Sequence, residues 1–270
     1  MRRLALLFAF FASAPAFAAE GYVEALYGGE PVCLIASVSG ASIAPLSDPE
    51  AVPPALGPSS WRLATLDGLG GSAEGATPAL ADCGCIEVPQ VALTPVDAMT
   101  GSAIATNLPL QPAKKLERLS PDHPAYVKAA RAWLDERGLA LAPVRLTHVI
   151  RTDLEGDGTD EVILAGAYNA VEVQEADLSA GRYAFLLLRQ VVNGAIVTTA
   201  LADYANPHPY EADDVAYGAS LVEPVAIVDL TGDGTAEVVL LAWLYESVAF
   251  TLYRLDGGAL SVAAECGCGC

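Results

Sequence analysis

Apolar positions in the second half of the chain form short runs that are separated by turn residues, and the order of these runs repeats. Each repeat has a strand-like run, an acidic loop, two more runs, a tight turn and a last run. The tight turns contain Asn193-Gly194 and Asp256-Gly257, which are strong signals for β-hairpins. The runs are 143–152, 162–168, 182–192 and 195–204 in the first repeat, and 221–228, 238–246, 247–255 and 259–265 in the second.

This order predicts two four-stranded antiparallel β-meanders in tandem, at about 144–204 and 219–266. A meander of this kind is the plan of a propeller blade, but a closed propeller takes about four or more blades. Either the N-terminal part of the chain supplies the rest of a propeller, or the two sheets pack face to face.

One α-helix is expected between about Ser120 and Arg137. Ser120 or Asp122 is suited to be the N-cap, prolines suit the first turn, and Gly138 marks the end. Apolar residues at spacings of three and four share one face, which we expect to pack against a sheet. The residues of this face are Tyr126, Ala129, Ala130, Trp133 and Leu134.

Residues 19–112 are rich in Pro, Gly, Ala and Ser, and turn signals separate short strand-like runs. They predict an irregular β segment whose strand pairing the sequence leaves open. The expected fold class is therefore mainly β with one helix, and residues 113–270 hold the helix, both repeats and a Cys-rich tail. The N-terminal runs are 32–38, 61–66, 86–93 and 103–108.

Residues 1–18 have the order of a signal peptide. Arg2 and Arg3 precede the apolar stretch 4–11, and small residues follow up to Ala18. The apolar stretch is shorter than the ~20 residues that a membrane-spanning helix needs. We therefore expect an exported protein, periplasmic or secreted, without membrane insertion.

Acidic residues outnumber basic ones, with 33 Asp and Glu against 14 Lys and Arg, and the net charge is −19. Nucleic acids and anionic membrane surfaces are bound by clusters of Lys or Arg, so neither is an expected partner. The charge suits divalent cations or basic partners, although most of the acidic residues serve solubility.

Two nearly identical acidic decapeptides, DLEGDGTDEV at 153–162 and DLTGDGTAEV at 229–238, each lead into an apolar run. Side chains at positions 1, 3 and 5 converge where the backbone curls, and Gly at position 6 permits the sharp turn. The carbonyl at position 7 then faces inward, and the acid at position 9 closes the loop. Gathered oxygen ligands of this kind are typical of Ca²⁺ sites. An EF-hand is excluded because position 12 is Leu164 or Leu240, inside a β run, rather than Glu.

The decapeptides resemble the calcium loops of FG-GAP/VCBS repeats, the blade elements of integrin-like β-propellers. The resemblance covers both loops and the strands beside them, and it implies Ca²⁺ as the bound cofactor. Thr159 and Thr235 would contribute their backbone carbonyls. The implied ligands are Asp153, Glu155, Asp157, Thr159 and Glu161 in the first loop, and Asp229, Thr231, Asp233, Thr235 and Glu237 in the second.

The chain departs from the pattern of this family in three respects. The Phe-Gly and Gly-Ala-Pro signatures that name the repeat are absent. Position 9 is Glu where Asp is common, and position 3 is Glu155 or Thr231 where Asn or Asp is usual. Thr231 makes the second loop the weaker candidate.

The chain has three His residues, and we expect none of them to be catalytic. His148 lies in a strand-like run in which Val144, Leu146, His148 and Ile150 should share one apolar face, so a core position is expected. His123 stands at the start of the helix, where it is expected near the cap.

His208 lies in a Pro-bracketed loop beside Glu211, Asp213 and Asp214, which is a candidate partner contact or extra cation site. The same residues would form the site of the alternative function, a secreted hydrolase. No nucleophile elbow, zincin helix or phosphate-binding Gly loop accompanies them.

Six cysteines form two groups, one in the N-terminal segment and one in the tail ECGCGC. In an oxidising compartment an even number of cysteines suggests disulfides, and six allow 15 pairings. A bridge within C-x-C closes a strained ring, so pairing between the two groups is favoured over pairing within them. A soft-metal site of three thiolates is the alternative. The cysteines are Cys33, Cys83, Cys85, Cys266, Cys268 and Cys270.

These patterns together predict an exported calcium-binding β-repeat protein. It would act as a structural module or bind a protein or carbohydrate partner, and the sequence names neither partner nor substrate.

Overall fold

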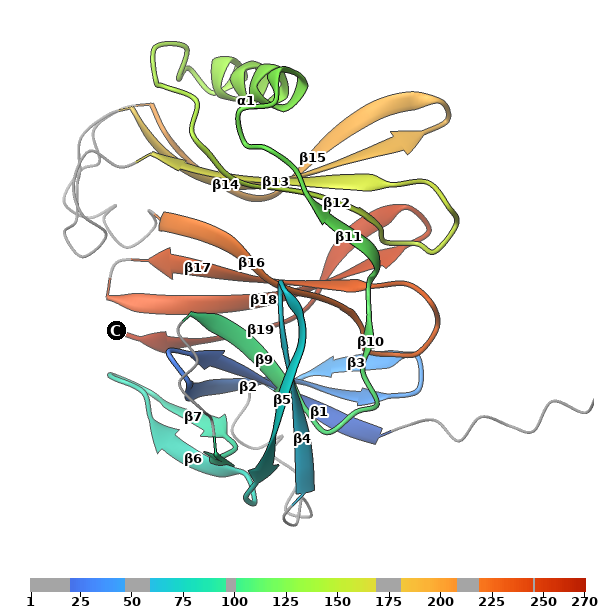
Figure 1. Ribbon diagram of the computed structural model, residues 1–270. Coiled ribbons are helices and arrows are strands. Elements are labelled where there is room, and N and C mark those ends of the chain that lie inside the picture. The colour runs from blue at the N-terminus through green and yellow to red at the C-terminus, as the bar shows by residue number, and fades with distance from the viewer. Residues whose placement is uncertain (1–19, 47–58, 96–100, 169–180, 208–218, 245) are drawn as a thin grey trace, which may run out of the picture.

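The computed structural model describes residues 20–46, 59–95, 101–168, 181–207, 219–244 and 246–270. The expected signal peptide and the His208 loop lie outside these residues. The described chain is mainly β with one α-helix, as the sequence predicts (Figure 1).

Three antiparallel sheets hold almost all of the strands. The N-terminal sheet has the strand order β3-β2-β1-β9-β4-β5-β8, the first sheet β11-β12-β13-β14-β15, and the second sheet β10-β16-β17-β18-β19, while β6 and β7 pair separately. The N-terminal strands are β1 (Glu20–Tyr27), β2 (Glu30–Ser39), β3 (Ser42–Pro45), β4 (Ser59–Thr65), β5 (Gly68–Gly75), β6 (Ala79–Asp82), β7 (Glu87–Gln90), β8 (Leu93–Thr94) and β9 (Ser102–Thr106).

The two predicted meanders are the cores of the first and second sheets. Each is four consecutive strands, and each gains one short edge strand from residues 111–118, which the sequence did not predict. The remaining elements are β10 (Gln111–Pro112), β11 (Lys114–Arg118), α1 (Pro124–Glu136), β12 (Leu146–Asp153), β13 (Glu161–Tyr168), β14 (Arg182–Val192), β15 (Ala195–Asn206), β16 (Ala219–Asp229), β17 (Glu237–Leu244), β18 (Ser247–Asp256) and β19 (Ala259–Gly269).

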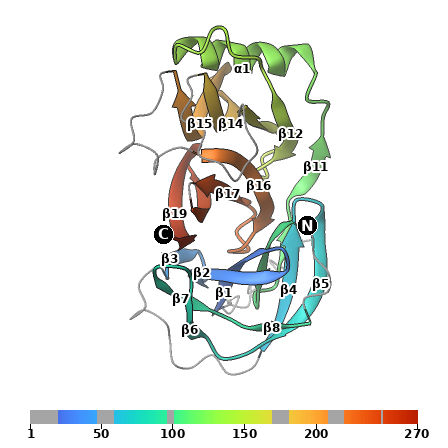
Figure 2. The same ribbon diagram turned by 90° about the vertical axis from the view of Figure 1, so that its left-hand side faces the viewer.

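The sheets stack face to face in a row, with α1 on the outer face of the first sheet (Figures 1 and 2). The second sheet lies in the middle of the row and is covered on both faces. Its strand β17 alternates between the two cores, because Val238 and Leu240 pack toward the first sheet and Val239 and Leu241 toward the N-terminal sheet. Burial on both faces explains why this run is continuously apolar rather than alternating.

Helix α1 begins one residue after His123, not after Ser120 or Asp122. His123 is the N-cap, and its Nδ1 accepts a hydrogen bond of 3.3 Å from the N–H of Ala125. Pro124 therefore occupies the first turn, where its missing N–H costs nothing. The predicted apolar face is confirmed, because Ala130, Trp133 and Leu134 are buried against the first sheet.

The expectation that Val144, Leu146, His148 and Ile150 share one face is wrong. The pairing of β12 with β13 shifts between Leu146 and His148, which places an extra residue in β12. A bulge of this kind reverses the alternation of faces. Leu146 therefore packs on the helix side and Ile150 on the side of the second sheet, while His148 is half-buried rather than a core residue.

Three disulfides connect the two groups of cysteines, as predicted. Each joins one N-terminal cysteine to one tail cysteine, and no cysteine is free to hold a metal. The tail extends β19, and Gly269 bonds to the backbone of Cys83 and Cys85, so the end of β19 lies beside the β6–β7 turn. The pairs are Cys33–Cys266, Cys83–Cys268 and Cys85–Cys270.

No helix in the described part of the chain is long and apolar enough to cross a membrane.

Glu24 is a fully buried carboxyl in strand β1 of the N-terminal sheet. Its Oε2 accepts a hydrogen bond of 3.1 Å from the N–H of Val91, and its Oε1 has no partner. Burial raises the pKa of Glu24 well above its usual value, and the hydrogen bond from Val91 acts against this shift. The folded protein therefore favours the neutral acid.

We expect substitution of the Cys33–Cys266 pair by Ser at both positions to lower the free energy of unfolding by ~2–4 kcal/mol. The pair links residues that are 233 positions apart, so its loss frees a long loop in the unfolded chain. Urea unfolding of the oxidised parent and variant would measure the change. Peptide mapping without reductant that links the cysteines in other pairs would contradict the arrangement.

We expect the contribution of Glu24 to the stability of the protein without bound metal to fall as the pH rises above the pKa of this group in the unfolded chain, ~4.3. Because the pKa of Glu24 is raised in the folded state, folding takes up a proton in this range, and the loss ends at the folded pKa. The isosteric variant Glu24→Gln should reduce this pH dependence and raise the unfolding free energy at pH 8, where the parent has to keep a proton on a buried acid or bury a charge. Equal pH profiles for parent and variant would contradict this role.

Candidate cation-binding loops

Both acidic decapeptides connect neighbouring strands, as predicted. The first loop joins β12 to β13 and the second joins β16 to β17. Gly158 and Gly234, at position 6, have φ values of +90° and +93°, a backbone conformation that favours glycine. The Leu at position 2 anchors each loop, because Leu154 and Leu230 are buried in the cores on either side of the second sheet.

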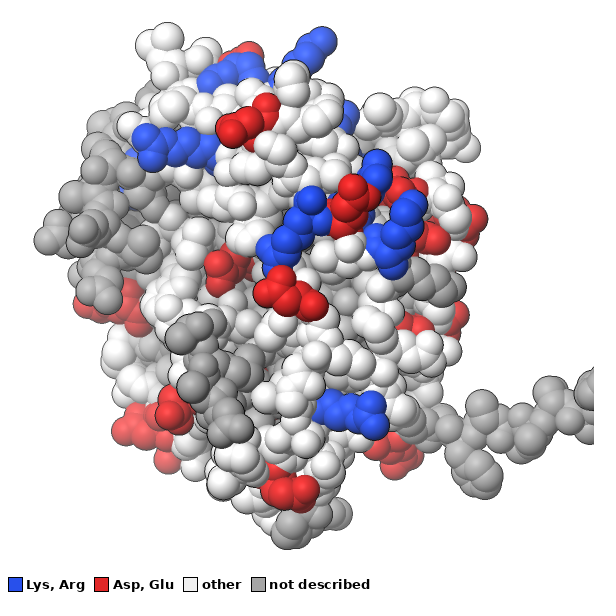
Figure 3. Space-filling model, viewed as in Figure 1, with Lys and Arg blue, Asp and Glu red and all other residues white. Residues whose placement is uncertain are grey.

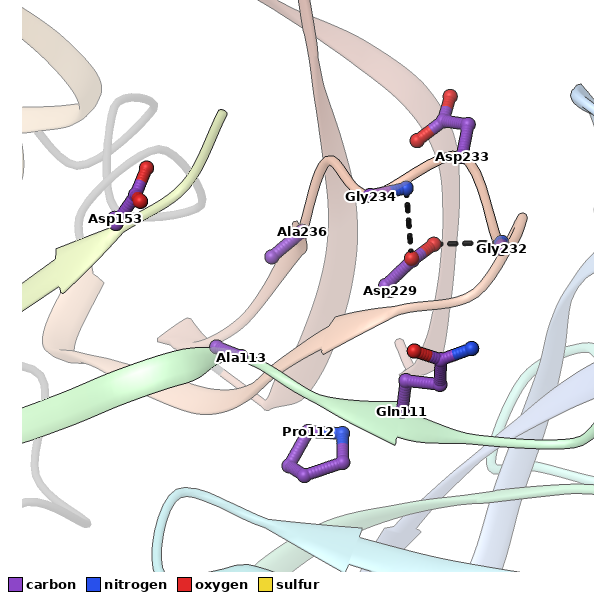
Figure 4. Close-up of a pocket in the computed structure, with 9 residues that line it drawn as sticks. All are labelled: Gln111, Pro112, Ala113, Asp153, Asp229, Gly232, Asp233, Gly234 and Ala236. Atoms are coloured by element: carbon purple, nitrogen blue, oxygen red, sulfur yellow. Dashed lines mark hydrogen bonds between the residues drawn. The ribbon is translucent and has the colours of Figure 1, made fainter. Parts of the chain in front are cut away.

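Similar hydrogen bonds shape both loops, and the one at position 6 is common to them. In the first, the carboxylate of Asp153 accepts from the N–H groups of Asp157 (3.1 Å) and Gly158 (2.9 Å). In the second, Asp229 accepts from Gly232 (2.6 Å) and Gly234 (2.9 Å) (Figure 4). The Asp at position 1 thus holds the turn closed.

The acid at position 5 fixes the residue at position 7 in both loops. Asp157 Oδ1 accepts from the N–H of Thr159 at 2.7 Å, and Asp233 Oδ1 accepts from Thr235 at 2.9 Å. Each of these carboxylates keeps its second oxygen for another partner. Glu155, at position 3 of the first loop, is exposed to solvent.

The Glu at position 9 lies buried at the base of each loop. Glu161 is 2% exposed and Glu237 is 0% exposed. Their Oε2 atoms accept the N–H of position 2, from Leu154 at 2.7 Å and from Leu230 at 2.8 Å. Burial raises the pKa of both carboxyls to about 7, the hydrogen bond opposes this rise, and the neighbouring acids add to it.

The second loop contains two buried oxygen atoms without a hydrogen-bond partner, Glu237 Oε1 and Thr231 Oγ1. A buried polar atom without a partner costs free energy, and a cation held by this loop would give such an oxygen a partner. This observation makes the second loop the better fit of the two, although Thr231 weakened it in the sequence. In the described part of the chain, no group of three or more His, Cys, Asp or Glu side chains converges closely enough to hold a metal ion.

The two loops touch each other. The N–H of Ala236, at position 8 of the second loop, donates to the carbonyl of Leu154 at 2.7 Å. A cavity of about 220 Å³ lies beside this contact, lined by the second loop, by Asp153 and by residues 111–113 (Figure 4). Thus the structure brings the two predicted sites together, which the sequence did not indicate.

The basic residues near the two loops pair differently. Beside the first loop, Lys115 and Arg151 lie 3.4 and 3.5 Å from Asp160, which is at position 8 and is not an expected ligand. Beside the second loop, Arg254 lies 2.9 Å from Asp233, which is an expected ligand. Figure 3 shows Lys and Arg over β11 and β12 next to acidic side chains.

The sequence did not single out Arg254 or residues 111–113. Arg254 comes from β18, 21 positions after Asp233, and only the hairpin geometry brings the two side chains together. The available signal in the sequence was the difference between the repeats, because the second copy has the charged Arg254 where the first copy has the neutral Gln190.

The histidines contribute nothing to these loops in the described structure. His148 lies on β12, where burial lowers its pKa and the charge of Glu223 acts against this. His123 caps α1. His208 and its acidic neighbours, the site of the alternative hydrolase, lie outside the described residues.

The two loops are therefore candidate cation sites on the grounds of their geometry and of the resemblance of their sequence to calcium loops. Each presents carboxylates on a closed turn, over a buried Glu whose proton affinity is raised by its surroundings. No protein-family model, no curated protein and no solved structure matches this chain.

Proposed function

We propose that this is an exported calcium-binding β-repeat protein in which Ca²⁺ stabilises the junction between the two loops. The observation that carries the proposal is the repeated loop geometry over a buried Glu, with unpaired buried oxygens in the second loop. Its resemblance to FG-GAP/VCBS calcium loops supports the same cation.

The residues suited to hold the ion are those at positions 1, 3, 5 and 9, with the carbonyls of position 7. Ca²⁺ takes six to eight oxygen ligands, and it would supply positive charge to carboxylates that otherwise repel one another. The ligand set is Asp153, Glu155, Asp157, Thr159 and Glu161, and Asp229, Thr231, Asp233, Thr235 and Glu237.

A structural role fits the position of the loops. They meet through the bond between Ala236 and Leu154, so the ions would brace the same edge of two stacked sheets. The three disulfides fit an oxidising compartment, which supports a periplasmic or secreted location. The braced sheets would then present a surface to a protein or carbohydrate partner.

We expect Ca²⁺ to raise the melting temperature, because a ligand that binds only the folded state stabilises it by mass action. With a Kd of about 10⁻⁴–10⁻³ M, typical of extracellular modules, saturation at one hundred times Kd would contribute ~2.7 kcal/mol per site. Asp157→Ala and Asp233→Ala should each remove part of the rise. Scanning calorimetry with and without Ca²⁺ measures it.

Asp160→Ala is the matched control, because Asp160 is an acid of the first loop that pairs with Lys115 and Arg151 rather than pointing to the expected site. Its rise with Ca²⁺ should equal that of the parent. A melting temperature of the parent that does not respond to 10 mM Ca²⁺, a concentration above the ~10⁻³ M limit of extracellular modules, would refute calcium binding.

A further inference from the structure

Arg254 of strand β18 occupies a ligand oxygen of the second loop. Its Nη2 lies 2.9 Å from Asp233 Oδ2, while Asp233 Oδ1 accepts the N–H of Thr235. Its Nη1 donates to the carbonyl of Ala41, in the turn between β2 and β3. Both oxygens of the acid at position 5 are therefore engaged, one of them by a cation that belongs to the chain.

The first repeat shows what stands in the place of Arg254 there. At position 10 of the loops, Val162 pairs with Arg189 across the first sheet, and Val238 pairs with Tyr253 across the second. The next residue along each partner strand is Gln190 in the first repeat and Arg254 in the second.

Gln190 is neutral, and its side chain bonds to another part of the chain. Its Nε2 donates to the carbonyl of Gly258 at 2.6 Å, so it links the first sheet to the β18–β19 turn. Among the described residues, no Lys or Arg forms an ion pair with Asp157, the first-loop counterpart of Asp233. The two copies thus differ by one internal positive charge at equivalent positions.

We propose that Arg254 is an internal counter-ion that competes with Ca²⁺ for the second loop and sets its affinity below that of an otherwise equal loop without it. This inference rests on the proposed function, because it concerns the affinity of the same site. Calcium affinity depends on the charge of the ligands.

The two loops differ in the charge of their expected ligands. The first presents four acids at positions 1, 3, 5 and 9, whereas the second presents three acids and faces the guanidinium of Arg254. An ion entering the second loop has to displace Arg254 from Asp233 Oδ2 or share that oxygen with it. It is also repelled by the positive charge itself.

The unpaired oxygens of the second loop make this competition informative. Glu237 Oε1 and Thr231 Oγ1 remain buried and without partners although Arg254 is near. The guanidinium therefore neutralises part of the charge of this loop without satisfying its inner oxygens. Those atoms stay open to a bound cation, so Arg254 weakens the binding of the ion rather than replacing it.

The test abolishes the Ca²⁺ site of the first loop by substitution and then varies only Arg254. In the background Asp153→Ala with Asp157→Ala, Ca²⁺ is titrated by calorimetry into the parent, Arg254→Gln and Arg254→Lys. Arg254→Gln reproduces the residue of the first repeat and should lower Kd about fivefold, the equivalent of ~1 kcal/mol for an ion pair that no longer competes. Arg254→Lys keeps the charge and should change Kd less.

A reciprocal variant keeps the inference testable if one background fails to fold. Gln190→Arg, in a protein with Asp229→Ala and Asp233→Ala, should weaken Ca²⁺ binding by the first loop. The melting temperatures without Ca²⁺ are the control, because loss of the tie to Ala41 alone would lower stability without changing Kd.

The outcomes separate the two proposals. If Ca²⁺ binds and the Kd of Arg254→Gln equals that of the parent, Arg254 only ties two sheets together and the inference is wrong, while calcium binding stands. If neither the unmodified protein nor any Arg254 variant responds to 10 mM Ca²⁺, a concentration above the expected ~10⁻³ M limit, both proposals are wrong.

Discussion

Burial of both faces of the second sheet is the constraint on which the rest of the structure depends. Its strands contact the first sheet on one side and the N-terminal sheet on the other, so the side chains on both faces have to be apolar. A sheet covered in this way cannot end in polar loops without providing hydrogen bonds for their backbone. The decapeptides provide them, since Asp at position 1 and Glu at position 9 accept the N–H groups of the turn.

The same burial gives the second loop an acid with a raised pKa. Glu237 stands where β17 enters the stack, and its carboxyl is fully buried beside the backbone of Leu230, whose N–H donates to it. A charge in such a place is costly unless another charge compensates it. The raised proton affinity of Glu237 and its unpaired Oε1 are two expressions of one fact, which is that the fold places an acid where only a proton or a cation can satisfy it.

Repetition and divergence act together at these loops. The hydrogen bonds of the two turns are nearly the same, so the scaffold of each loop is common to both repeats. The surroundings are not, because Arg254 pairs with Asp233 of the second loop, whereas Gln190, at the equivalent position of the first repeat, donates to Gly258. Arg254, a residue outside the motif, thus adds to the charge difference that Glu155 and Thr231 make within it.

Most elements of the repeats could be predicted because their signals are local. Alternation of apolar residues, Asn-Gly and Asp-Gly turns and the Gly at position 6 each act within a few residues, and the strands lie where these signals place them. The bulge in β12 was not predictable in this way, because it places Leu146 and Ile150 on opposite faces of the sheet without any Gly or Pro to mark it.

The sequence by itself determined the strands of the two repeats, the loops between them, the helix and the grouping of the cysteines. Only the tertiary structure decided which tail cysteine meets which partner, how the N-terminal strands pair, and that the two loops touch through Leu154 and Ala236. The tertiary structure also decided that Arg254 lies beside Asp233. The physical reason is that these contacts join segments far apart in the chain, or on separate strands, and their geometry follows from how whole sheets stack rather than from any local pattern.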